Sequence, residues 1–131
     1  MAKLTIILLL SILPVSHAFG QLPDCLKFRE GKFRIADTQA GVVTIAERKG
    51  MYQTESSESL KLVARFRIAW QDNCNFTLKL DKIIRNENRI ELPVNLEIRV
   101  KITGTSADSY TQEVSSSITN GSYQVKAVKI N

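Results

Sequence analysis

The chain has 131 residues, with 18 lysines and arginines against 13 aspartates and glutamates, for a net charge of +5. This length is enough for one hydrophobic core, and we expect no second domain. Its single histidine, His17, lies in an apolar leader. The rest of the chain therefore excludes catalysis or metal ligation by imidazole, and we predict no metal site.

Residues 1–20 have the features of a cleaved signal peptide. Lys3 supplies the positive start, residues 4–15 are apolar, and small residues at Ala18 and Gly20 fit a cleavage site, with cleavage after Ala18 as the competing choice. A membrane anchor is the alternative, but the apolar run is short and no stop-transfer charges follow it. We predict an exported protein, periplasmic, outer-surface or secreted, that does not span the membrane. Residues 21–131 form a single β domain of charge +4, from 17 basic and 13 acidic residues.

Two cysteines, Cys25 and Cys74, lie 49 positions apart in that domain. An even count behind a signal peptide predicts one disulfide. Two buried thiols or a redox pair are the alternatives, but redox cysteines usually lie close together in sequence.

The first predicted strand runs from Leu26 to Ala36 and contains a defect. Its apolar residues change parity between Phe28 and Phe33, on either side of Gly31. A glycine at a parity change predicts a β-bulge or a sharp bend.

The next two predicted strands differ in character. Residues 42–48 form the second strand, with Val43 and Ile45 expected to point inward. Residues 51–55 form a third strand that is polar on both faces, which is typical of an edge strand or a mobile flap.

The stretch 60–84 has a clear hairpin pattern. Apolar residues recur at every second position on both sides of a three-residue turn at 71–73. This register places Phe66 opposite Leu78, so that the apolar rows of the two strands share one face.

The last third of the chain predicts three more strands. Residues 85–91 are polar and are expected to form an exposed loop or a single helical turn. Strand six follows from Val94 to Ile102, with its apolar residues at even positions. Strands seven and eight flank Asn120-Gly121, a strong two-residue turn signal, whose register places Val114 opposite Ala127.

Eight strands with short connections predict an all-β protein, an up-and-down antiparallel meander that closes into a small barrel, with a β-sandwich as the alternative. The Cys-x-Lys-Phe…Gly-Lys-Phe pattern at 25–33 and the Trp-Gln-Asp-Asn-Cys-Asn-Phe pattern at 70–76 resemble a group of small exported proteins of gram-negative bacteria. The resemblance implies no activity. Gly-Lys-Phe at 31–33 is also similar to the Gly-x-Trp of lipocalins, although Phe33 replaces the tryptophan.

We expect a non-enzymatic binding module without a cofactor. The inward rows are apolar with almost no polar group, so the barrel either packs full or holds one small hydrophobic ligand. The candidate ligand-binding residues are Phe33, Phe66, Trp70 and Phe76. Carboxylates lie at bends and loops, but no spacing places two together, and phosphate-binding loops and nucleophile motifs are absent from the sequence.

The alternative function uses the outer face of strands four to six, which carries a set of basic residues: Lys61, Arg65, Arg67, Lys79, Arg99 and Lys101. As a structural or envelope-interaction surface, it would bind anionic lipid or polysaccharide. Nucleic acid is not an expected partner, because the face lacks interleaved aromatic residues.

Overall fold

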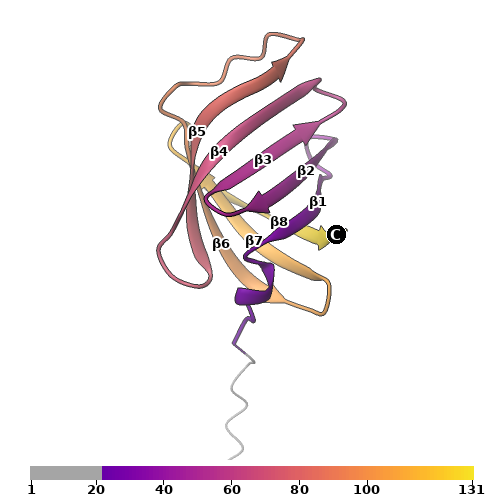
Figure 1. Ribbon diagram of the computed structural model, residues 1–131, viewed down its shortest axis with the longest axis vertical. Coiled ribbons are helices and arrows are strands. Elements are labelled where there is room, and N and C mark those ends of the chain that lie inside the picture. The colour runs from indigo at the N-terminus through magenta and orange to yellow at the C-terminus, as the bar shows by residue number, and fades with distance from the viewer. Residues whose placement is uncertain (1–21) are drawn as a thin grey trace, which may run out of the picture.

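The computed structural model describes residues 22–131, so the predicted signal peptide lies outside the described residues. Each strand pairs antiparallel with the next, and the last pairs with the first, which closes a barrel (Figure 1). The strands are β1 (Gly31–Asp37), β2 (Val42–Lys49), β3 (Tyr52–Ser57), β4 (Leu62–Trp70), β5 (Asn75–Asn86), β6 (Glu97–Thr105), β7 (Ser109–Ser116) and β8 (Ser122–Lys129). The predicted eight-stranded meander is therefore confirmed, and the alternative sandwich is wrong.

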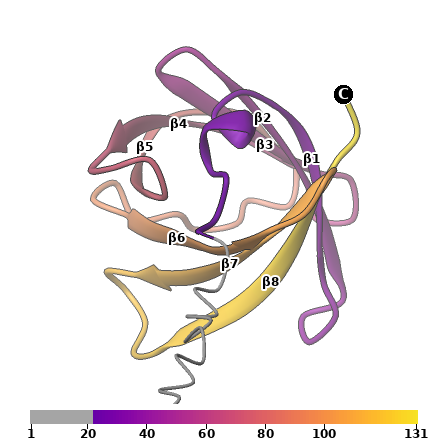
Figure 2. The same ribbon diagram turned by 90° about the horizontal axis from the view of Figure 1, so that it is seen from below.

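A short 3-10 helix, η1 (Leu26–Phe28), lies at one end of the barrel (Figure 2). The predicted disulfide joins Cys25 to Cys74, with the two Cα atoms 5.3 Å apart. It fastens the helix to the connection between β4 and β5. Phe28 is 1% exposed and packs against the barrel interior at this end.

The predicted first strand over 26–36 is wrong in its first half. The chain is helical at 26–28 and turns into β1 at Gly31, whose φ of 136° is one that side-chain-bearing residues rarely adopt. The change of parity between Phe28 and Phe33 marks this change from helix to strand and not a bulge within one strand.

The predicted orientation of β2 is also wrong. Val43 is 38% exposed, whereas Ala46 and Arg48 are buried, so the even positions point inward. The reason lies in the pairing, since Ala46 is directly opposite the inward Phe33 of β1. Opposed residues project from the same face of a sheet.

The third strand is not an edge or a flap. β3 pairs along its length with β2 on one side and with β4 on the other. Its polar side chains at Gln53 and Ser57 are buried inside the barrel. The interior is therefore not uniformly apolar, contrary to the expectation from the sequence.

Both predicted hairpin registers are shifted. Phe66 pairs with Leu80 and not with Leu78, because five residues, 71–75, separate the paired Trp70 and Phe76, two more than the predicted turn. The Asp72 carboxylate accepts the N–H groups of Cys74 and Asn75 and holds this longer turn.

Between β7 and β8 the connection spans 117–121. As a result Val114 pairs with Tyr123, and Ala127 pairs with Tyr110. The apolar rows keep their faces in both hairpins, because the partners shift by an even number of residues.

The end of the barrel opposite η1 is formed by the connections 38–41, 58–61, 87–96 and 117–121, which we call the mouth. β6 begins at Glu97 and not at Val94, which is 93% exposed. β5 pairs with β6 only over 75–79, so residues 80–86 extend along β4 alone toward the mouth (Figure 1).

Candidate functional site

The half of the barrel interior nearer the mouth contains a cavity of about 290 Å³. Its wall includes Ile35, Val42, Leu78, Ile98, Val114 and Val125, from six different strands. Polar side chains contribute as well, including Gln53 and Glu55 from β3. The volume lies near the lower end of the range for ligand pockets, about 300–1,000 Å³.

A second cavity of about 170 Å³ lies beside the first, beneath the connection 87–96. Leu92 and Leu96 of that connection line it together with Phe66. Both cavities share Thr44, Glu55 and Ile98 in their walls, so Glu55 borders the two spaces.

The lower half of the interior is packed solid, and we call it the floor, formed by Phe28, Phe33, Arg48, Phe76 and Tyr110. The Arg48 guanidinium lies 4.7 Å from the ring centre of Phe33 and 4.8 Å from that of Phe76. Its Nη atoms donate to the Phe28 carbonyl, at 3.2 Å, and to the Tyr110 hydroxyl. Arg48 therefore joins η1 to the barrel wall.

Glu55 lies directly above this floor. It pairs with Ala46 on one side and Ala64 on the other, and both alanines are buried. Gln53 Nε2 donates to Glu55 Oε1 at 2.8 Å. Gln53 is only 3% exposed, and its Oε1 has no hydrogen-bond partner among residues 22–131.

Burial raises the pKa of the Glu55 carboxyl above its usual 4.5, because low-dielectric surroundings disfavour the charged form. The hydrogen bond from Gln53 and the charge of Arg48 oppose this shift. No salt bridge reaches Glu55 within the described part of the chain, so the carboxylate has no cationic partner in contact.

Of the four predicted ligand-binding aromatics, only Phe66 lines an interior cavity. Phe33 and Phe76 belong to the floor, and Trp70 stacks on Phe76 with ring centres 4.6 Å apart. The polar residues Arg48, Gln53 and Glu55 were missed. Their spacing at alternate positions within each strand over 42–57 could have indicated that they share a face, but alternation alone does not indicate which face of a strand points inward.

The six predicted basic residues lie on the outer wall, on or beside β4 to β6. Arg65 is neutralised, with its Nη2 2.7 Å from the Asp81 carboxylate, and Lys61 is 3.9 Å from Glu87. The other four are Arg67, Lys79, Arg99 and Lys101, and no salt bridge to them occurs in residues 22–131.

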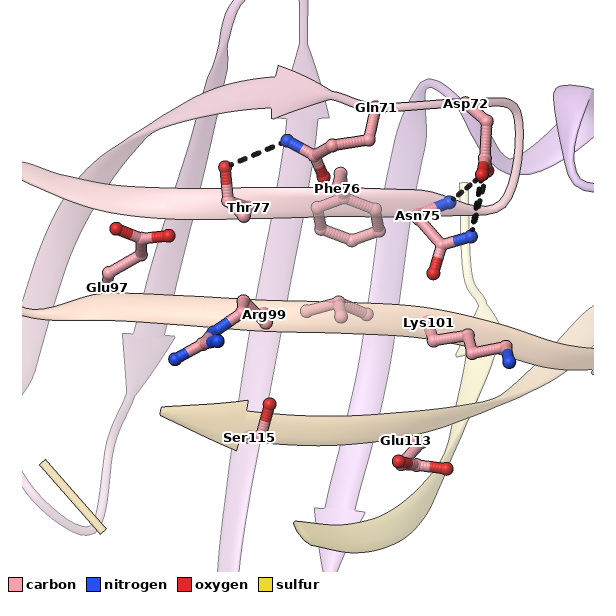
Figure 3. Close-up of a pocket in the computed structure, with 11 residues that line it drawn as sticks. Gln71, Asp72, Asn75, Phe76, Thr77, Glu97, Arg99, Lys101, Glu113 and Ser115 are labelled. Atoms are coloured by element: carbon pink, nitrogen blue, oxygen red, sulfur yellow. Dashed lines mark hydrogen bonds between the residues drawn. The ribbon is translucent and has the colours of Figure 1, made fainter. Parts of the chain in front are cut away.

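Arg99 and Lys101 line a groove of about 550 Å³ on the outside of β5, β6 and β7 (Figure 3). Three carboxylates, Asp72, Glu97 and Glu113, line the same groove. Two positive and three negative side chains give it a net charge of −1. This groove therefore lacks the excess positive charge that an anionic polymer would need.

Comparison with protein families, curated proteins and solved structures finds no match for this chain. The resemblance to small exported bacterial proteins stays a prediction. In residues 22–131 no helix is long and apolar enough to cross a membrane. The same residues bring no three histidine, cysteine or acidic side chains together as metal ligands would be.

Proposed function

We propose that this protein is an exported, non-enzymatic barrel that binds one small, largely apolar molecule in its upper interior. The observation that carries the proposal is the 290 Å³ cavity, which is walled by aliphatic side chains at the end opposite η1. Since η1, the floor and the disulfide close the other end, the mouth is the route for a ligand.

Polar groups in the cavity support binding over simple imperfect packing. A partly buried carboxylate and an unpartnered buried amide oxygen are costly in a domain whose core needs only to fold. Binding sites commonly combine an apolar wall with a few polar groups of this kind. The disulfide is typical of an oxidising compartment and agrees with the predicted export.

Two adjacent positions provide a matched test. Val42 lines the cavity, whereas Val43 lies on the outside of the same strand. We expect Val42→Trp to fill the cavity and to weaken the binding of 1-octanol, followed by NMR chemical-shift titration, while Val43→Trp leaves binding unchanged. Equal binding by both variants, or no binding by the natural protein, would refute the proposal.

A second candidate function is contact with an anionic surface through Arg67 and Lys79. The observation in its favour is that Arg67 and Lys79 are directly opposite each other on β4 and β5. Like charges at such positions are destabilising, and an anionic partner would relieve the repulsion. Arg67→Glu should reduce co-sedimentation with phosphatidylglycerol vesicles, whereas Lys126→Glu, on the exposed face of β8 across the barrel, should not.

A further inference from the structure

We propose that the interior site recognises a small organic cation, an alkylamine with one ammonium group and an apolar body, and that the Glu55 carboxylate binds the ammonium group. This inference rests on the proposed ligand-binding function and names the chemical class of the ligand.

The surroundings of Glu55 leave room for a ligand group. Its neighbours on β2 and β4 are Ala46 and Ala64, whose side chains are single methyl groups. Both cavities border the carboxylate. A partly buried carboxylate without a cationic partner is unfavourable, and an ammonium ion would provide that partner at the place where space exists.

Gln53 provides an independent observation. Its Oε1 is buried, unpartnered among residues 22–131 and in the wall of the larger cavity, while its Nε2 is already committed to Glu55. Gln53 therefore presents a free acceptor and no free amide donor to the ligand, while the other polar wall residues, Thr44, Gln112 and Tyr123, carry donors of their own. An ammonium group has three donors for such acceptors, an alcohol has one, and a carboxylate has none.

Arg48 is not available to an anionic ligand in the same way. Its Nη groups are bonded to Phe28 and Tyr110, and its plane lies against the floor rings. Arg48 lines neither cavity. The positive charge of the interior is therefore held at the floor, below the space that a ligand would occupy.

The mouth adds a second negative charge. Asp37, at the end of β1, lines the larger cavity beside the half-exposed Tyr123 of β8. The pKa of Tyr123 is raised first by burial and then by the negative charges of Asp37 and Glu55. A negative potential along the route to Glu55 favours cations and disfavours fatty-acid anions.

Three probes of equal chain length test the inference: octylammonium, 1-octanol and octanoate, titrated into the protein at pH 7.5 and followed by NMR chemical shifts. We expect octylammonium to bind roughly ten- to a hundredfold more tightly than 1-octanol, because hydrogen bonds to a charged group are the stronger ones. Octanoate should bind most weakly. Glu55→Gln should abolish the preference for ammonium while 1-octanol still binds.

Glu47→Gln is the matched control, since it removes the same charge from the exposed outer face of β2. It should leave the ranking of the three probes unchanged. If circular dichroism shows that Glu55→Gln is unfolded, the pH dependence of binding to the natural protein still tests whether Glu55 binds the ammonium group.

The pH dependence involves the charged and titratable groups near Glu55. The charge of Arg48 lowers the pKa of Glu55, and the charge of Glu55 raises the pKa values of Tyr110 and Tyr123. The charge of Asp37 also raises the pKa of Tyr123. The tyrosines keep their protonation in mild acid, since their pKa values are raised, and so does an alkylammonium ion. Acidification through the raised pKa of Glu55 should therefore weaken octylammonium binding and leave 1-octanol binding largely unchanged.

The outcomes separate the two proposals. If 1-octanol binds and octylammonium binds no better, the inference is overturned while the ligand-binding function stands. Preference for octanoate would also overturn it and would point to Arg48 as the anchor. If none of the three probes binds, both proposals fail.

Discussion

One closed barrel wall surrounds both halves of the interior, but the two halves are packed differently. At the floor, Arg48 lies against aromatic rings and bonds to η1, and the region is nearly closed to solvent. Toward the mouth, the same strands β2 and β3 carry Thr44, Gln53 and Glu55, and space remains between the walls. One charge is fully packed, and the other borders a cavity.

This difference indicates that the floor contributes mainly to stability and that the region near the mouth is suited to binding. Arg48 is a buried charge that joins structural elements, because its Nη atoms donate to Phe28 and Tyr110 and its guanidinium lies against aromatic rings, although its Nε has no hydrogen-bond partner among residues 22–131. Glu55 has one hydrogen bond from a neighbouring side chain and no salt bridge in the described residues. Changes at the floor should therefore affect folding, and changes near the mouth should affect binding.

The largest expected effect is at the floor. Phe76 is 1% exposed and packs against both Arg48 and Trp70. Phe76→Ala should lower the free energy of unfolding by about 3–5 kcal/mol, measured by urea denaturation. Val125→Ala, in the wall of the larger cavity, is the comparison and should cost less than about 1.5 kcal/mol. Equal costs would mean that the two halves are packed alike.

The disulfide should contribute nearly as much as the floor aromatics. Replacing Cys25 and Cys74 together by serine removes a cross-link over 49 positions. The chain-entropy estimate for such a loop is about 4 kcal/mol. If the floor and the mouth are independent, a variant that remains folded should still bind 1-octanol. Loss of binding in a folded variant would show that η1 helps to shape the cavity.

The pH dependence of stability should identify Glu55. Its pKa is raised in the folded protein, so the folded state holds this proton more tightly than the unfolded chain does. Its contribution therefore makes stability fall as the pH rises from about 4.5 through the raised pKa and then level off. Glu55→Gln should remove this slope and should be more stable than the natural protein at neutral pH in urea denaturation. An unchanged slope would contradict this assignment.

The smallest expected effect lies on the outer wall, away from both halves of the interior. Lys79→Glu would replace the opposed like charges of Arg67 and Lys79 with an attractive pair. The expected gain is about 0.2–1 kcal/mol in the free energy of unfolding, and it should shrink at high salt. The binding of interior ligands should not change. A loss of stability would show that the two side chains do not face each other.

Much of the fold could be predicted from the alternation of apolar residues. The rows that contain Phe66, Leu78 and Val100 are apolar on one side only, and all three residues are buried. The pairing of Cys25 with Cys74 followed from their being the two cysteines of a domain predicted to be exported. The hairpin registers were less predictable, because a side-chain contact within the turn, such as that of Asp72, sets how many residues the turn takes.

The candidate site could not be predicted, because the sequence of β2 favours the wrong face and that of β3, polar on both faces, favours neither. Taken alone, Val43 and Ile45 are better core residues than Ala46 and Arg48. Only the closed barrel decides otherwise. Phe33 of β1 and Phe66 of β4 must point inward, so their opposed partners, Ala46 and Gln53, must point inward too.

The sequence by itself thus determined the strands, their order and the cross-link, because these depend on local periodicity and on cysteine chemistry. The tertiary structure decided which polar residues are inside. Pairing on both sides of a strand fixes its facing regardless of its own composition, and closure extends that constraint around the whole barrel (Figure 1). Glu55 lies in the interior for that reason.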